Sequence, residues 1–230
     1  MMHLKGFEKF SLLDYDDKVA AVMFFGGCNM CCPFCHNSDI VLKPNSTPDY
    51  PLKEAMEYLK NRKGLIDAVV VTGGEPTLMP ELLSLLKDLR ELGYIIKLDT
   101  NGTNPNVLKT IIDENLVDYI AMDIKNSYQK YALTAGRNVD LDNIKESIEI
   151  IMNSGLDYEF RTTLVNAYHT LDDIKNIKEM IKGAKKYRLQ KFTDHGTCIK
   201  KGLREVPYDI ALEFVNELKN DILDVSLRGY

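Results

Sequence analysis

The sequence predicts an α/β protein in which helices cover a parallel sheet. Two observations predict this class. Short apolar, β-branched runs alternate with amphipathic stretches along the 230 residues, at roughly the 30–35 residues per unit that a strand–helix–strand motif needs. Polar residues of unusual type follow directly after the predicted strands, where parallel α/β proteins bind their ligands. The pattern is compatible with an open, doubly wound sheet and with part of a barrel.

Each predicted strand is a short apolar run bounded by turn residues. The first run, VAAVMFF, leads straight into a cysteine-rich loop, and the second, AVVV, leads into two glycines. In chain order the six predicted strands cover residues 19–25, 68–71, 94–98, 117–124, 158–165 and 187–192.

Apolar residues at helical spacing predict a helix after each strand. The clearest is 80–92, in which four leucines recur at i, i+3, i+4 and i+7 and Gly93 ends the helix. Pro105 suits the first turn of another helix, and Gly155 closes a helix whose isoleucines face inward. The six predicted helices cover residues 51–61, 80–92, 105–114, 141–153, 171–182 and 207–219.

The bulk composition indicates one globular domain over residues 1–230, with an N-terminal extension of about 1–18 and a C-terminal helix at about 207–220. A net charge of -5 argues against nucleic acid or an anionic membrane as the partner. No run approaches the roughly 20 apolar residues of a membrane span, and the first ten residues lack the apolar core of a signal peptide. We therefore expect a cytoplasmic, reducing location in which cysteines remain thiols.

Four of the five cysteines lie within eight residues: Cys28, Cys31, Cys32 and Cys35, with Cys198 apart. Thiols this close on one loop are typical of a metal site or an iron–sulfur cluster. The spacing allows both C-x3-C-x2-C, which leaves out Cys31, and C-x2-C-x3-C, which leaves out Cys32. Three ligands leave one iron of a four-iron cluster open, which indicates chemistry at the cluster.

A structural zinc site with His36 as fourth ligand is the main alternative. Such sites usually draw a second ligand pair from a distant segment, and the chain has none. His36 either donates a hydrogen bond near the cluster or is a simple loop residue. His169 and His195 are expected to be surface or loop residues, and Cys198 a structural or free thiol.

Gly73, Gly74, Glu75 and Pro76 follow the second predicted strand. Two glycines there let a ligand approach the backbone. A tight turn in which Glu75 complements a helix dipole explains the residues equally well.

Two carboxylates, Asp99 and Asp123, end neighbouring predicted strands. They would repel each other unless a cation or ligand donors lie between them, although Lys125 could form a plain salt bridge with one. Arg161 lies within a strand and needs a carboxylate partner, either from a ligand or from one of these aspartates. The basic run at 185–188 is expected to be a solvated patch.

The cysteine loop resembles that of the radical S-adenosylmethionine superfamily, in which an aromatic residue precedes the last cysteine of C-x3-C-x2-C. Here Phe34 precedes Cys35, and residues 72–76 resemble the superfamily's GGE stretch. The resemblance implies a partial (β/α)6 barrel of TIM type and a [4Fe–4S] cluster on Cys28, Cys32 and Cys35, with Cys31 outside it. It implies S-adenosylmethionine contacts from Phe34, Gly73, Gly74, Glu75, Pro76, Asn101, Lys125, Arg161 and Gln190.

Residues 10–15, 27–29 and 35–37 resemble glycyl-radical-enzyme activating enzymes, and most closely those of anaerobic ribonucleoside-triphosphate reductase. Residues 98–102 and 122–125 resemble pyruvate formate-lyase activase, which holds a monovalent cation with two aspartates. The resemblance implies a possible Na⁺ or K⁺ site at Asp99, Thr100, the Ala121 carbonyl and Asp123. One segment departs, because relatives carry a Pro-Gly turn where Tyr15 and Asp16 follow Asp14.

The implied activity is reductive cleavage of S-adenosylmethionine to methionine and a 5′-deoxyadenosyl radical, with an electron from a flavodoxin or ferredoxin. The radical removes hydrogen from a glycine of the partner reductase, so no catalytic residue is needed beyond the cluster ligands. One alternative is a radical enzyme acting on a small metabolite, as in deazapurine or cofactor biosynthesis. Another is a non-catalytic iron–sulfur or zinc protein, which would not explain Asp99, Asp123 and Arg161.

Overall fold

The computed structural model describes residues 3–230. Contacts divide the chain into two compact units, each built from several segments. Unit 1 comprises the described residues up to Asn29, Asp39–Thr100 and Asn106–Ile120, and unit 2 comprises Met30–Ser38, Asn101–Pro105 and Ala121–Tyr230. Within each unit, hydrogen-bonded strands follow one another in chain order. The single domain expected from composition stays a prediction.

The sheet of unit 1 is parallel apart from its first strand. Its strands are β1 (Leu4–Ser11), β2 (Ala20–Phe25), β3 (Ala68–Gly73) and β4 (Ile95–Thr100). β1 pairs antiparallel with β2, whereas β2, β3 and β4 are parallel to one another. Ala20–Met23 and Ala68–Val71 are fully buried, as expected of parallel strands covered on both faces.

The helices associated with unit 1 follow the predicted positions closely. They are α2 (Leu52–Asn61), α3 (Leu82–Glu91) and α4 (Pro105–Asp113), with a short α1 (Ser38–Leu42) before them and the 3-10 helix η1 (Pro76–Leu78) between β3 and α3. The four spaced leucines of α3 are buried, as predicted. Gly93 follows α3 with φ of 78°, a left-handed conformation that ends a helix at little cost for glycine.

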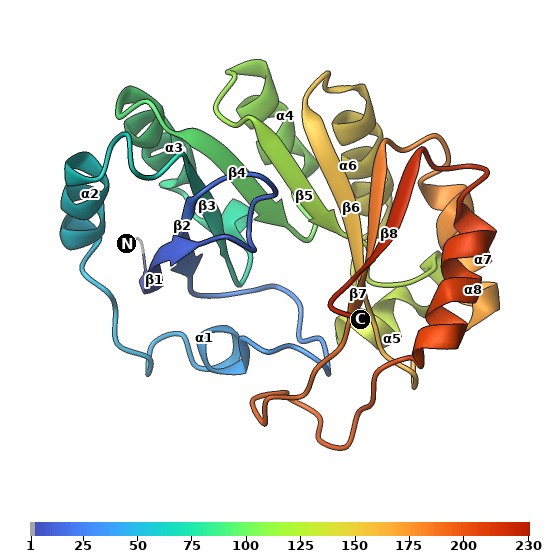
Figure 1. Ribbon diagram of the computed structural model, residues 1–230. Coiled ribbons are helices and arrows are strands. Elements are labelled where there is room, and N and C mark those ends of the chain that lie inside the picture. The colour runs from blue at the N-terminus through green and yellow to red at the C-terminus, as the bar shows by residue number, and fades with distance from the viewer. Residues whose placement is uncertain (1–2) are drawn as a thin grey trace. The chain divides into compact units, whose positions relative to one another are not determined.

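Unit 2 repeats the strand–helix alternation. β5 (Tyr119–Asp123) enters it from unit 1 and is followed by β6 (Asp157–Leu164), β7 (Lys186–Lys191) and β8 (Asp224–Arg228). β6, β7 and β8 are parallel. The helices are η2 (Tyr128–Lys130), α5 (Tyr131–Ala135), α6 (Leu141–Asn153), α7 (Leu171–Met180) and α8 (Tyr208–Leu218). α8 packs beside α7 and β8 at the C-terminal end of the chain (Figure 1).

The structure corrects the expectations for two edge strands and for Arg188. Within residues 3–230, β1 and β8 bring the strands to eight, because edge strands with several charged residues lack the apolar run that identifies a buried strand. Arg188 is buried, not solvated, and pairs with Asp224 at 2.5 Å. His169 lies in a loop as expected but is only 3% exposed.

Within residues 3–230, no helix is long and apolar enough to cross a membrane.

The segment between β1 and β2 differs from the relatives' Pro-Gly turn, and it packs at the amino ends of the unit 1 strands. The Lys97 ammonium donates to the carbonyl oxygen of Asp14 at 2.5 Å, and the ring centroids of Tyr15 and Tyr119 are 5.3 Å apart. Tyr15 also packs against the buried residues at the start of β2 and β3. The segment therefore lies at the opposite end of β2 from Cys28.

Candidate functional site

In unit 1, the loop that carries Cys28 lies directly against two glycines, Gly73 at the end of β3 and Gly74 directly after it. The amide of Gly74 donates to the Phe25 carbonyl and that of Glu75 to the Gly27 carbonyl, each at 2.8 Å. A Cβ atom on Gly74 would lie 1.9 Å from the Gly27 oxygen, and one on Gly73 2.3 Å from the Phe25 backbone. Only glycine permits this approach, so the pair lets the Phe25 and Gly27 backbone, just before Cys28, lie close to the end of β3.

Glu75 is 2% exposed and organises the start of η1. Its Oε1 accepts hydrogen bonds from the Thr77 amide at 3.1 Å, the Thr77 hydroxyl at 2.5 Å and the Thr100 hydroxyl at 2.8 Å. The capping role considered for Glu75 is therefore present. The same carboxylate joins the ends of β3 and β4, which the sequence did not indicate.

Asp99 has a protein cation on its own strand. The Lys97 ammonium lies 3.7 Å from Asp99 Oδ1, and Lys97 and Asp99 share one face of β4 because side chains alternate along a strand. Lys97 is only 3% exposed and lies 5.9 Å and 5.6 Å from the ring centroids of Tyr15 and Tyr119. The i, i+2 spacing would have identified this lysine from sequence.

In unit 2, Asp123 is held by two cations. The Arg161 Nε lies 2.9 Å from Oδ1 and the Lys125 Nζ 3.0 Å from Oδ2. The expectation that Arg161 pairs with a carboxylate is confirmed, with Asp123 as the partner. The salt bridge of Lys125 with an aspartate, considered as the simple alternative, is also present.

Charge controls the protonation of this group. Burial would raise the pKa of Asp123, but the charges and hydrogen bonds of Arg161 and Lys125 lower it to about 2. Burial likewise acts to lower the pKa of Lys125, yet Asp123 and then Cys32 raise it overall. Both groups are therefore charged at neutral pH.

Two buried residues that the sequence did not predict as site residues, Tyr131 and His169, support this ion pair. The Tyr131 hydroxyl donates to the Asp123 carbonyl at 3.5 Å. His169 Nε2 lies 3.0 Å from the Lys125 carbonyl, and its Nδ1 lies 3.0 Å from the Val165 amide. Burial lowers the pKa of His169, so a neutral imidazole links the Lys125 backbone to the loop after β6. No spacing in the sequence would have indicated these contacts.

The four clustered cysteines are divided between the two units. Cys28 is in unit 1, whereas Cys31, Cys32 and Cys35 are in unit 2. Cys32 is buried, and burial raises its pKa although the charge of Lys125 opposes this. Cys31 is held by its backbone, because its amide donates to the Ala135 carbonyl at 2.8 Å and its carbonyl faces Gly136. Which thiols are ligands stays a prediction.

Among residues 3–230, no three His, Cys, Asp or Glu side chains converge on a point that one metal ion could occupy. A four-iron cluster does not require such convergence, because each thiolate binds a different iron atom. Asp99 and Asp123 each have cationic partners within their own unit. The monovalent cation site therefore stays a prediction.

The other predicted contact residues have local structural roles. The Asn101 side chain accepts from the Thr103 amide and hydroxyl at 3.1 and 2.7 Å, an Asx turn. The buried Phe34 ring lies 6.3 Å from that of Tyr168. Ala121 is buried in β5, Pro76 opens η1, and Gln190 is half-buried beside Thr163. Their contacts with a cofactor stay predictions.

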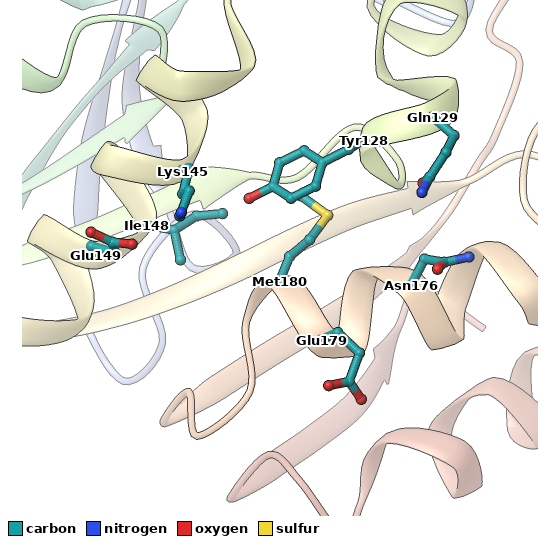
Figure 2. A pocket seen from close by; sticks show the side chains of 8 residues that line it. All are labelled: Tyr128, Gln129, Lys145, Ile148, Glu149, Asn176, Glu179 and Met180. Carbon is teal, nitrogen blue, oxygen red and sulfur yellow. The ribbon is translucent and has the colours of Figure 1, made fainter.

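Unit 2 also has a cavity of about 370 Å³ among η2, α6 and α7. Figure 2 shows the eight side chains that line it, and none is a predicted site residue: Tyr128, Gln129, Lys145, Ile148, Glu149, Asn176, Glu179 and Met180. Burial, followed by the charges of Glu149 and Asp142, raises the pKa of Tyr128. The cavity opens among helices, apart from the strand-end groups described above.

The model of the Radical SAM superfamily matches residues 22–184. This range contains the four clustered cysteines and every other predicted site residue except Gln190. The resemblance to this superfamily is thereby confirmed.

Three relatives illustrate the similarity. A candidate glycyl-radical enzyme activating enzyme of Methanocaldococcus jannaschii is 33% identical, with 82% of this chain and 79% of the relative covered. The pyruvate formate-lyase-activating enzyme of Clostridium pasteurianum is 25% identical over 82% and 81%. A 7-carboxy-7-deazaguanine synthase of Thermococcus kodakarensis is 25% identical over 69% and 68%.

Among solved structures, a domain of the pyruvate-formate lyase-activating enzyme of Bacteroides vulgatus matches with a TM-score of 0.59 at 18% identity, covering 71% of this chain and 99% of that one. A Streptococcus suis structure, SuiB bound to S-adenosylmethionine, matches with a TM-score of 0.68 at 13% identity, covering 88% and 48%. These matches confirm the predicted fold class.

Proposed function

This chain belongs to the radical S-adenosylmethionine superfamily, and we propose that it activates a glycyl radical enzyme. One observation carries the proposal: the similarity to an activating-enzyme relative extends over 82% of this chain and 79% of that relative. The oxidoreductase class follows from the superfamily's redox chemistry.

Superfamily membership implies a [4Fe–4S] cluster and S-adenosylmethionine, and the donor groups fit both. Three cysteines with the C-x3-C-x2-C spacing, Cys28, Cys32 and Cys35, would hold the cluster. When bound, the cluster supplies the electron that cleaves S-adenosylmethionine to methionine and a 5′-deoxyadenosyl radical. The half-exposed glycine strand end of unit 1 supplies backbone groups to a polar ligand.

The protein's own residues prepare this chemistry. Gly73 and Gly74 bring the Cys28 loop against β3, and Glu75 fixes the turn that follows them. Burial raises the pKa of the Cys32 thiol, and the positive charge of Lys125 opposes this shift. Arg161 and Lys125 are the charged groups that would meet a ligand carboxylate, in exchange for part of their contact with Asp123. The remaining proposed cofactor contacts are Phe34, Gly73, Gly74, Glu75, Pro76, Asn101 and Gln190.

We extend the proposal to a monovalent cation held by Asp99, Thr100, the Ala121 carbonyl and Asp123. Such binding requires Asp123 to release one of its two protein cations. Activity that rises with K⁺ or Na⁺ at constant ionic strength would support the site, whereas equal activity in tetramethylammonium would exclude it.

The proposed partner is an anaerobic ribonucleoside-triphosphate reductase, with a flavodoxin or ferredoxin as electron donor, in the cytoplasm. The test is electron paramagnetic resonance of the reduced, reconstituted protein mixed with a candidate reductase and S-adenosylmethionine. A glycyl radical doublet should appear, and should be absent with a reductase whose glycine is replaced by alanine. If 5′-deoxyadenosine forms but no reductase acquires the doublet, this partner is wrong.

A radical enzyme acting on a small metabolite is the second candidate. It is favoured by the similarity to the 7-carboxy-7-deazaguanine synthase, which extends over 69% of this chain. This alternative predicts that a small pterin-like or purine-like substrate, without a protein partner, increases 5′-deoxyadenosine formation. The activating-enzyme proposal predicts that only a partner protein does so.

A further inference from the structure

A segment that follows β7 lies along the cysteine loop within unit 2. We name residues 192–201 the strap. The Lys200 amide donates to the Pro33 carbonyl at 2.8 Å, and the Ser38 hydroxyl donates to the Thr197 carbonyl at 2.5 Å. The strap lies beyond residue 184, where the match to the superfamily ends.

Side chains add two further contacts at the centre of this contact region. The Cys198 thiol donates to the Phe34 carbonyl at 3.7 Å, a distance suited to the larger sulfur atom. The ring of Phe192, where the strap begins, stacks on His36 with centroids 5.6 Å apart and an interplanar angle of 11°. Cys35 is thus flanked in sequence by four residues that the strap contacts: Pro33, Phe34, His36 and Ser38.

The cysteine loop depends on such support because residues 28–37 belong to no helix or strand. Cys35 makes a local turn, its amide donating to the Cys32 carbonyl at 2.9 Å. A loop without a regular hydrogen-bond ladder keeps a single conformation only when neighbouring elements restrain it. A metal-binding side chain held in place by its surroundings binds with less loss of conformational entropy.

We propose that the strap positions Cys35 for cluster binding, with Cys198 as a positioning residue and not a ligand. This inference rests on the proposed function, because it assigns Cys35 to a cluster. Cys198 is only 3% exposed, and its Sγ donates to the Phe34 carbonyl. Burial and Asp194 raise the pKa of Cys198 to about 11, so the thiol keeps the proton that it donates.

The first test uses the protein without its cluster and measures amide hydrogen exchange in residues 34–38. Cys198→Ala removes the donor, and we expect exchange there to become roughly fivefold faster, the effect of one net hydrogen bond. Cys198→Ser keeps a donor and should restore exchange to within about twofold of the natural protein. Ser38→Ala, at a half-exposed position, removes a second strap contact and should also accelerate exchange.

Thr193→Ala is the matched control, because Thr193 is an exposed strap residue and no hydrogen bond is formed by its side chain among residues 3–230. It should leave the exchange of residues 34–38 unchanged. Circular dichroism of each variant checks that the fold is kept. Unchanged exchange in both Cys198→Ala and Ser38→Ala would overturn the proposal.

The second test measures how fast a chelator removes iron from the reconstituted cluster. Cys198→Ala should lose iron roughly fivefold faster, and Cys198→Ser should behave like the natural protein. If both variants lose iron faster than the natural protein and at the same rate, the thiol itself binds iron, which contradicts a positioning role. If both lose iron at the natural rate, Cys198 does not position the loop. If the natural protein yields no 5′-deoxyadenosine but the exchange results hold, the proposed function fails while the strap's role in ordering the loop stands.

Discussion

The two units present carboxylates in contrasting settings at their strand ends. In unit 1, Glu75 accepts three hydrogen bonds from uncharged donors of Thr77 and Thr100, beside glycines that leave no room for a side chain. In unit 2, Asp123 is held by the charges of Arg161 and Lys125. Backbone space and hydrogen bonds therefore shape the first setting, and charge shapes the second. The two should respond differently to substitution and to pH.

The largest expected effect is loss of the cluster, and it should not depend on which unit supplies the cysteine. Cys28→Ala in unit 1 and Cys32→Ala or Cys35→Ala in unit 2 should each abolish the iron–sulfur absorbance after anaerobic reconstitution, because three thiolates are needed. Cys31→Ala is the matched control and should retain it. A variant at Cys31 that loses the cluster, beside a Cys32 variant that keeps it, would reverse the ligand assignment.

The next effect tests backbone space in unit 1. Gly74→Ala should lower the free energy of unfolding by at least about 3 kcal/mol, because its Cβ would overlap the Gly27 carbonyl and the loop must move. Chemical denaturation measures this. Gly6→Ala is the control, since its Cβ would make only an ordinary contact of 3.5 Å with Phe24. Equal stability of the two variants would show that the loop after β2 yields easily.

Charge in unit 2 is tested by Arg161→Met. We expect the free energy of unfolding, measured by chemical denaturation, to fall by about 2 kcal/mol. This lies between the values for exposed and buried ion pairs, because the Asp123 side chain is 32% exposed and Lys125 remains. Lys109→Met, which breaks an exposed pair with Asp113 on α4, is the control and should cost no more than about 0.5 kcal/mol. Similar losses in both would mean that the pair of Arg161 and Asp123 is fully solvated.

The same pair predicts a pH dependence. The pKa of Asp123 is lowered to about 2 from an ordinary value of 3.8, so its contribution to stability is complete above about pH 4 and disappears as the pH falls towards 2. Unfolding measured across this range should show a shallower acid decline in Arg161→Met than in the natural protein. Parallel declines would indicate that Asp123 is not held by Arg161.

The smallest effect is expected from Glu75→Gln. Glutamine keeps the Oε1 acceptor for Thr77 and Thr100, so the free energy of unfolding should fall by about 1 kcal/mol or less. Glu75→Ala leaves buried donors without this acceptor and should lower the free energy of unfolding by about 2–3 kcal/mol. Thermal unfolding of both variants measures the difference. If glutamine is as damaging as alanine, the negative charge matters in unit 1 as it does in unit 2.

The sequence predicted the parallel core well because buried strands and amphipathic helices have clear periodicities. α6 has the predicted bounds, and the strands from β2 to β7 lie within two or three residues of theirs. β1 and β8 escaped prediction because their charged residues hide the alternation. The family motif predicts Cys28, Cys32 and Cys35 as the cluster ligands. The spacing of the cysteines alone does not decide between Cys31 and Cys32.

Long-range contacts explain most of what the sequence did not indicate. The glycines at the end of β3 can make room for a ligand, yet their space is filled first by the Phe25 and Gly27 backbone that leads to Cys28. His169 binds the Lys125 backbone 44 residues away, and Cys198 the Phe34 backbone 164 residues away. No local pattern encodes these pairings, because they arise only when distant strand ends meet in the fold.

The most direct measurement of the central claim is the formation of 5′-deoxyadenosine by the anaerobically reconstituted protein, given S-adenosylmethionine and dithionite. The account predicts 5′-deoxyadenosine and methionine in equal amounts, and neither above background in Cys32→Ala under the same conditions. A reconstituted protein that holds a four-iron cluster yet produces no more 5′-deoxyadenosine than Cys32→Ala would contradict the radical chemistry proposed for this chain.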